Sequence, residues 1–92
     1  MQVEQTKQFS KTYKKLFANQ LPETNNAINE IIADPEIGEK KQGDLSWLRV
    51  YKYKLLGQLT LIGYTFDTDV LTFVALGPHE NFYRDVKRKY NT

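Results

Sequence analysis

The sequence predicts an α+β fold: an N-terminal strand and a helical hairpin pack on an antiparallel sheet of three to four strands, and a short C-terminal helix follows. Two observations lead to this prediction. Apolar residues recur at helical spacing in the first part of the chain, whereas Trp47 to Leu76 consists of runs rich in Tyr, Val, Leu and Thr. The length of 92 residues suits one hydrophobic core, so we expect a single domain over residues 1–92.

The composition excludes several classes of function. With 40% hydrophobic and 13% aromatic residues, the chain is predicted to fold rather than to stay disordered. It has no cysteine, so disulfides, thiolate metal sites and a cysteine nucleophile are excluded. Its start lacks the apolar region of a signal peptide, and no apolar run has the length of a membrane span. We therefore expect a cytoplasmic protein that does not enter a membrane.

The first part of the chain is predicted to form a strand over Gln2 to Gln5 and then two helices. Thr6 is a suitable N-cap for the first helix, and its apolar face consists of Phe9, Tyr13, Leu16 and Phe17. Pro22 fits the first turn of the second helix, which Asp34-Pro35 ends. The apolar face of that helix consists of Ala27, Ile28, Ile31 and Ile32. The two helices should form a hairpin.

A meander of three strands is predicted after a polar loop over Ile37 to Asp44. The short connections Leu56-Gly57 and Asp67-Thr68-Asp69 favour antiparallel hairpins. The strands are expected at Trp47 to Leu55, Gln58 to Phe66 and Val70 to Leu76. A final helix over Glu80 to Tyr90 should pack Phe82 and Val86 against the sheet.

Positive charge is concentrated in the carboxyl half, although the net charge is only +2. From Glu23 to Asp44 six acids accompany two bases, whereas Leu45 to Phe66 holds three bases and no acid. From Arg84 to Lys89 four bases accompany one acid. The carboxyl half therefore carries the positive potential of the chain.

The first predicted strand of the meander places two lysines side by side. Strand alternation assigns Leu48, Val50, Lys52 and Lys54 to one face, and Trp47, Arg49, Tyr51, Tyr53 and Leu55 to the other. Lys52 and Lys54 then lie within about 7 Å of each other. Such a pair, with no acid nearby in the sequence, suits phosphate binding. Lysines that simply solvate the outer face of a half-exposed sheet give the same pattern.

The second group of candidate residues follows the last strand. His79 is the only histidine, it comes after a Gly-Pro turn, and imidazole is the side chain best matched to proton transfer near neutral pH. Tyr83 shares a helical face with His79, so its phenol can stack on a base or hold a reacting group. Arg84 follows directly. The alternatives are a surface or capping histidine, a core tyrosine and a solvated basic helix end.

The order of these elements and two stretches resemble the RelE/ParE superfamily of toxins from bacterial type II toxin–antitoxin systems. The stretches are Gly43-Asp-Leu-Ser-Trp-Leu-Arg-Val-Tyr-Lys-Tyr-Lys54 and Leu76-Gly-Pro-His-Glu-Asn-Phe-Tyr-Arg-Asp-Val-Lys87. The resemblance covers essentially the whole chain. In RelE-like members the first motif brings basic side chains to the mRNA backbone, and the second supplies acid–base and stacking groups.

This resemblance implies roles for individual residues. Lys52 and Lys54 would be catalytic as phosphate-stabilising groups and would bind RNA phosphate together with Arg49 and Arg84. His79 would transfer a proton, and Tyr83 would orient or stack a base. The chain departs from the best-known RelE sites, because Gln58, Leu59, Thr60 and His79 stand where those sites carry arginines. It is closer to histidine-using relatives, although these use several histidines.

The function implied by the resemblance is a ribosome-dependent endoribonuclease, or mRNA interferase, that inhibits translation. Attack by an RNA 2′-hydroxyl on the adjacent phosphorus needs no metal and no other cofactor. The implied partners are the ribosome, mRNA and a cognate antitoxin in a toxin–antitoxin hetero-oligomer. One alternative is a ParE-like non-enzymatic inhibitor of DNA gyrase, which shares the fold and acts by binding a protein. A second is an inactive domain with a purely structural role.

Overall fold

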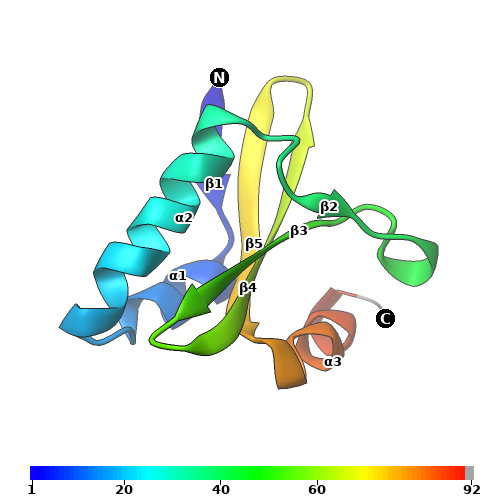
Figure 1. Cartoon of the computed structure of the whole chain (residues 1–92). Coiled ribbons are helices and arrows are strands. Elements are labelled where there is room, and N and C mark those ends of the chain that lie inside the picture. The colour runs from blue at the N-terminus through cyan, green and yellow to red at the C-terminus, as the bar shows by residue number, and fades with distance from the viewer. Residues whose placement is uncertain (91–92) are drawn as a thin grey trace.

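The structure is a computed structural model that describes residues 1–90, and a five-stranded sheet forms its centre (Figure 1). The strand order is β1-β5-β4-β3-β2, and every pair is antiparallel except the parallel pair β1–β5. Helices α1 and α2 pack on one face of the sheet, and α3 packs on the other. The elements are β1 (Gln2–Gln5), α1 (Lys7–Lys14), η1 (Ala18–Gln20), α2 (Leu21–Ala33), β2 (Glu39–Lys40), η2 (Gly43–Leu45), β3 (Arg49–Leu55), β4 (Gln58–Asp67), β5 (Val70–Pro78) and α3 (His79–Tyr90).

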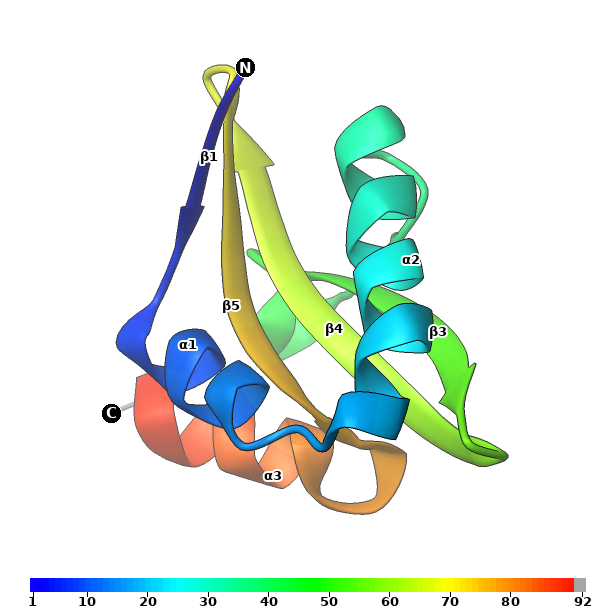
Figure 2. The ribbon, with the colours of Figure 1, turned by 90° about the vertical axis from the view of Figure 1, so that its left-hand side faces the viewer.

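The predicted α+β class and helical hairpin are confirmed, and Figure 2 shows α1 and α2 beside the sheet. Thr6 caps α1 as expected, since its Oγ1 accepts a hydrogen bond from the Phe9 backbone N–H at 3.1 Å. The prediction that Leu16 and Phe17 belong to this helix was wrong, because α1 ends at Lys14. Leu16 still packs against the core under the helices, whereas Phe17 is 74% exposed. Phe17 has extended backbone, and its N–H donates to Gln20 Oε1 at 2.8 Å, so it begins η1 instead. None of the helices in residues 1–90 has the length and apolarity that a membrane span requires.

The sheet is larger than the sequence predicts. The segment expected as a polar loop contains the two-residue strand β2, which pairs with β3 at the sheet edge. At the other edge β1 runs parallel to β5, with Gln2 opposite Val70 (Figure 2). Trp47 lies before β3 rather than in it, and its indole meets the Tyr90 ring edge-on at 5.9 Å between centroids. The three predicted meander strands are confirmed with small shifts of their ends.

Both hairpin turns of the meander use left-handed backbone. Leu56 and Gly57 connect β3 to β4 with φ values of 51° and 84°, and Thr68 and Asp69 connect β4 to β5 with 51° and 63°. Two successive residues with positive φ form the turn whose twist matches that of paired strands. Only one of these four residues is glycine, so the turns are strained at their leucine and threonine positions.

The sheet separates two apolar cores. The first lies under the helical hairpin and includes Phe9, Ile31 and the fully buried Tyr64. The second lies under α3 and includes Leu48, Leu61 and Phe82. Phe82 packs so closely on β4 that a Cβ added at Gly63 would come within 2.8 Å of its ring. Gly63 therefore sets the distance between α3 and the sheet.

Tyr64 also fixes the segment that leads into β2. Its hydroxyl accepts a hydrogen bond from the Gly38 N–H at 2.8 Å and donates one to the Pro35 carbonyl at 2.8 Å. Burial raises the pKa of this phenol, so the neutral donor is the favoured form. One hydroxyl thus joins the chain after α2 to the middle of the sheet.

Candidate functional site

Lys52 and Lys54 are both exposed, and both lie on the face of β3 that carries α3. Val50, two residues earlier on this face, is buried in the core under α3. The antiparallel register pairs Lys52 with Leu61 and Lys54 with Leu59, and these leucines contact the same core. The lysine stems therefore continue an apolar surface, while their ammonium groups face solvent beyond the edge of α3.

The register brings the start of α3 level with this lysine pair. Thr60 of β4 pairs with Pro78, the last residue of β5, and the neighbouring Leu59 pairs with Lys54. His79 follows Pro78 directly as the first residue of α3, so no loop separates it from the sheet. The backbones of β3 and β5 are two strand spacings apart, which is about 10 Å.

His79 and Tyr83 form an aromatic pair on the first turn of α3. Their rings meet edge-to-face, with centroids 6.2 Å apart and planes at 89°. The imidazole is exposed, whereas Tyr83 is partly buried and packs edge-on against Phe82 at 5.4 Å. Because Phe82 and Val86 are anchored in the second core, α3 holds Tyr83 in a fixed position beside the solvent-accessible imidazole.

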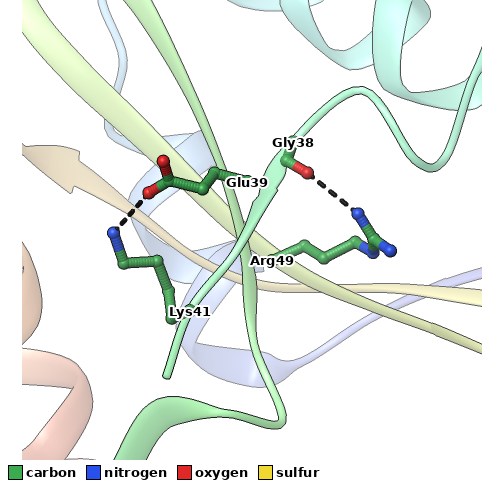
Figure 3. Close-up of polar contacts among 4 residues, drawn as sticks. All are labelled: Gly38, Glu39, Lys41 and Arg49. Carbon is green, nitrogen blue, oxygen red and sulfur yellow. Dashed lines mark hydrogen bonds and ion pairs between the residues drawn. The ribbon is translucent and has the colours of Figure 1, made fainter. Parts of the chain in front are cut away.

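A third cation, Lys41, contacts this aromatic pair. Its Nζ lies 5.3 Å from the centroid of the Tyr83 ring. The same Nζ lies 2.7 Å from Glu39 Oε1, as Figure 3 shows. The hydrogen bond from Lys41 is the main cause that lowers the pKa of the Glu39 carboxyl, and the charges of Lys41 and Lys52 lower it further. Tyr83, which contacts His79, is thus linked to Lys41, Lys41 to Glu39, and Glu39 through its charge to Lys52.

The two predicted arginines do not join this group. Arg49 lies on the opposite face of β3, where its guanidinium donates to the carbonyl of Gly38 at 2.9 Å and more weakly to that of Glu36 at 3.3 Å (Figure 3). Arg84 is exposed on α3 and contacts the adjacent Asp85 at 3.4 Å. Arg49 therefore stabilises the chain that leads into β2, and Arg84 forms its ion pair with its neighbour in the chain.

Glu39 and Lys41 were missed at the level of sequence because the strand that carries them has only two residues. A hydrophobic period cannot be recognised over such a short segment. The available signal was weak: residues two apart share a face if the segment is extended, which places Glu39 with Lys41. The structure shows which face this is. Glu39 pairs with Val50, and the Lys41 N–H donates to the Leu48 carbonyl at 3.0 Å. Val50 and Leu48 both belong to the core under α3, so Glu39 and Lys41 lie on the face that carries α3.

Comparison with known proteins assigns the chain to a family. A family model described as the ParE-like toxin of type II bacterial toxin–antitoxin systems matches residues 3–87. The chain belongs to this family. The predicted membership of the RelE/ParE superfamily is thereby confirmed, and the ParE-like chain is the toxin of a type II toxin–antitoxin system. No curated protein matches it.

Solved structures share the fold of this ParE-like toxin. A mutant of the toxin RelE from E. coli in the free state is 17% identical, with a TM-score of 0.68 over 97% of this chain and 96% of that chain. RelE in the intact E. coli RelBE toxin–antitoxin complex is 18% identical, with a TM-score of 0.65 over 84% and 94%. The hypothetical protein HP0894 from Helicobacter pylori is 24% identical, with a TM-score of 0.54 over 87% and 96%. These likenesses concern the fold.

Proposed function

We propose that this toxin is a ribosome-dependent endoribonuclease that cleaves translated mRNA. The observation that carries the proposal is the exposure of Lys52 and Lys54 on the same side of the sheet as the His79–Tyr83 pair. Cleavage of RNA through its own 2′-hydroxyl needs cationic groups around the phosphate and a group that moves protons. Both kinds of group lie on this side, and none of the ion pairs within residues 1–90 uses Lys52 or Lys54.

In the proposed reaction the 2′-oxygen attacks the adjacent phosphorus, and the bond from phosphorus to the 5′-oxygen breaks. The proton of the 2′-hydroxyl leaves to a base, and the departing 5′-oxygen gains a proton from an acid. His79 moves one of these protons, since it is exposed to solvent and imidazole can both donate and accept a proton. Lys52 and Lys54 stabilise the negative charge that builds up on the phosphate oxygens.

Tyr83 is assigned to the orientation of the substrate. Its ring is fixed by Phe82 and lies edge-on to His79, so a base that stacks on it would place its sugar near the imidazole. Arg84 is assigned a supporting contact to a more distant phosphate. The ribosome would hold the mRNA in the in-line geometry that a domain of 92 residues cannot impose alone.

A cognate antitoxin is the proposed resting partner of the toxin. One structural neighbour, RelE of E. coli, forms part of the intact RelBE toxin–antitoxin complex. The exposed edge strand β1 and the basic α3 side both support such a partner, because open strand edges and unpaired cations invite unwanted association. A toxin–antitoxin hetero-oligomer in the cytoplasm follows from this proposal.

The second candidate function is inhibition of DNA gyrase without catalysis. The description of the matching family as ParE-like favours it. One experiment distinguishes the two functions. The toxin is expressed in a short pulse, and mRNA 5′ ends are then mapped. Gyrase-dependent DNA breaks are assayed in the same cells. The endoribonuclease proposal expects new 5′ ends within translated codons and no DNA breaks. DNA breaks without new 5′ ends would replace it with gyrase inhibition.

A further inference from the structure

Glu39 and Lys41 occupy the rim of the α3 side between the lysine pair and Tyr83. Glu39 stands opposite Val50, and Lys41 is hydrogen-bonded to the backbone opposite Leu48, so both side chains rise on the face that carries α3. Figure 3 shows them together on one side of the chain, with Arg49 on the other. Lys41 is the less exposed partner of the ion pair, at 24% against 68% for Glu39.

We propose that Lys41 is a third phosphate-binding residue of the toxin site, and that Glu39 occupies in the free protein the place that an RNA phosphate oxygen takes in the complex. This inference rests on the proposed RNA substrate and adds two residues to its site. Carboxylate and phosphate oxygens accept the same charge-assisted hydrogen bonds from an ammonium group. Glu39 therefore indicates where such an acceptor fits.

The surroundings of Lys41 favour a binding role. The Tyr83 ring lies under the ammonium group of Lys41 and favours side-chain conformations that keep this group beside the ring, which also contacts His79. Fewer rotamers then have to be lost when a phosphate binds. Glu39 pairs with Lys41, and the charge of Lys52 also lowers the pKa of its carboxyl, so the carboxylate is within electrostatic reach of both cations. A phosphate at that position would interact with both.

Glu39 is suited to be displaced. Its side chain is largely exposed, and an exposed lysine–carboxylate pair is a weak interaction that salt screens further. The carboxylate costs the free toxin little, yet it keeps two cations partly neutralised until a phosphate arrives. Removing its charge should therefore strengthen RNA binding, which is the opposite of what loss of a substrate ligand would do.

The test is the binding of a fully 2′-O-methylated, single-stranded RNA oligonucleotide, which cannot be cleaved through its 2′-oxygens, measured by fluorescence anisotropy over a range of salt concentrations. Lys41→Met should weaken binding by about five-fold at low salt and reduce the slope of log K against log salt by about 0.7, the value for one phosphate contact on a single strand. Glu39→Gln should tighten binding by about two- to five-fold. Lys41→Arg should restore the wild-type salt slope, because it keeps the cation.

Matched controls lie on the opposite side of the chain. Lys40 is opposite Arg49 in the sheet and faces away from α3, and Glu36 lies in the segment before β2. Lys40→Met and Glu36→Gln change the net charge by the same amounts and should have smaller effects than Lys41→Met and Glu39→Gln. The inference is overturned if Lys41→Met and Lys40→Met bind alike.

Cleavage of mRNA on ribosomes is measured in parallel with the wild type. If the wild type cleaves while Lys41→Met and Lys40→Met bind RNA alike, the inference fails and the proposed function stands. If the wild type neither cleaves mRNA nor shows a salt-dependent affinity for the oligonucleotide, the proposed function fails and this inference fails with it.

Discussion

Replacement of Tyr64 by phenylalanine removes one buried hydroxyl and two hydrogen bonds. The Gly38 N–H loses its acceptor at 2.8 Å and the Pro35 carbonyl loses a donor at the same distance. Gly38 is buried, so its N–H cannot turn to water, whereas the partly exposed Pro35 can recover part of its loss. An unsatisfied buried group costs about 1–3 kcal/mol, and the second bond adds about 1 kcal/mol, so Tyr64→Phe should lower the free energy of unfolding by about 2–4 kcal/mol.

Urea unfolding followed by circular dichroism measures this change. For a chain of this size the loss corresponds to a fall in Tm of about 10–25 °C. Tyr13→Phe is the matched control, because its hydroxyl bonds to Asn25 Oδ1 at the surface and should contribute about 0.5 kcal/mol or less. An unfolding free energy for Tyr64→Phe equal to that of Tyr13→Phe would refute the assigned role of the Tyr64 hydroxyl.

The same hydroxyl makes stability depend on alkaline pH. Burial raises the pKa of Tyr64 in the folded state, whereas the unfolded phenol ionises near its usual value of about 10. The stability that the protonated phenol of Tyr64 contributes is complete below the pKa of the unfolded state. It is lost as the pH rises through the pKa of the folded state, because the unfolded chain releases this proton at a lower pH than the folded chain does. The wild type should lose stability above about pH 10 more steeply than Tyr64→Phe. Equal slopes would contradict this linkage.

Three further predictions concern the site and the first hairpin turn. His79→Ala should slow cleavage of ribosome-bound mRNA by about 100-fold or more while leaving ribosome affinity nearly unchanged, and a wild-type cleavage rate would exclude proton transfer by this residue. The double change Lys52→Ala and Lys54→Ala should weaken both cleavage and binding, with a binding defect that shrinks at high salt; a defect independent of salt would argue against phosphate contacts. Leu56→Asn should raise the unfolding free energy by about 0.5–1 kcal/mol, because asparagine tolerates the φ of 51° at this exposed position, and an unchanged urea midpoint would show that the turn is not strained.

The sequence predicted those parts of the fold that depend on repeated local signals. The alternation from Val50 to Lys54 gave the correct face for each side chain, and the spacing of Phe82 and Val86 gave the buried face of α3. Thr6 and Pro22 marked the starts of two helices for reasons that are local in the chain. Each of these features repeats, or is decided, within a few residues.

Features decided by distant partners could not be read in the same way. β2 is a strand only because β3 offers it hydrogen bonds, and the position of Lys41 over Tyr83 depends on both the sheet edge and α3. Phe17 fits the apolar period of the first helix, yet the helix ends before it. For the site, strand alternation predicted the lysine pair and helical spacing predicted the His79–Tyr83 pair. That the two pairs share one side of the sheet depends on the register between β3, β4 and β5, which no local pattern contains.

The parallel pairing of β1 with β5 has a consequence for the order in which the chain folds. The meander strands join neighbours in the sequence through two-residue turns, but Thr6, just after β1, bonds to Val74, 68 residues away. Closing so long a loop costs more chain entropy than closing a hairpin, and non-local pairing forms more slowly. We therefore expect β3, β4 and β5 to assemble first and β1 to be added last. In native-state hydrogen exchange β1 should open before the meander strands β3, β4 and β5, so a partner can remodel this edge more readily than the meander.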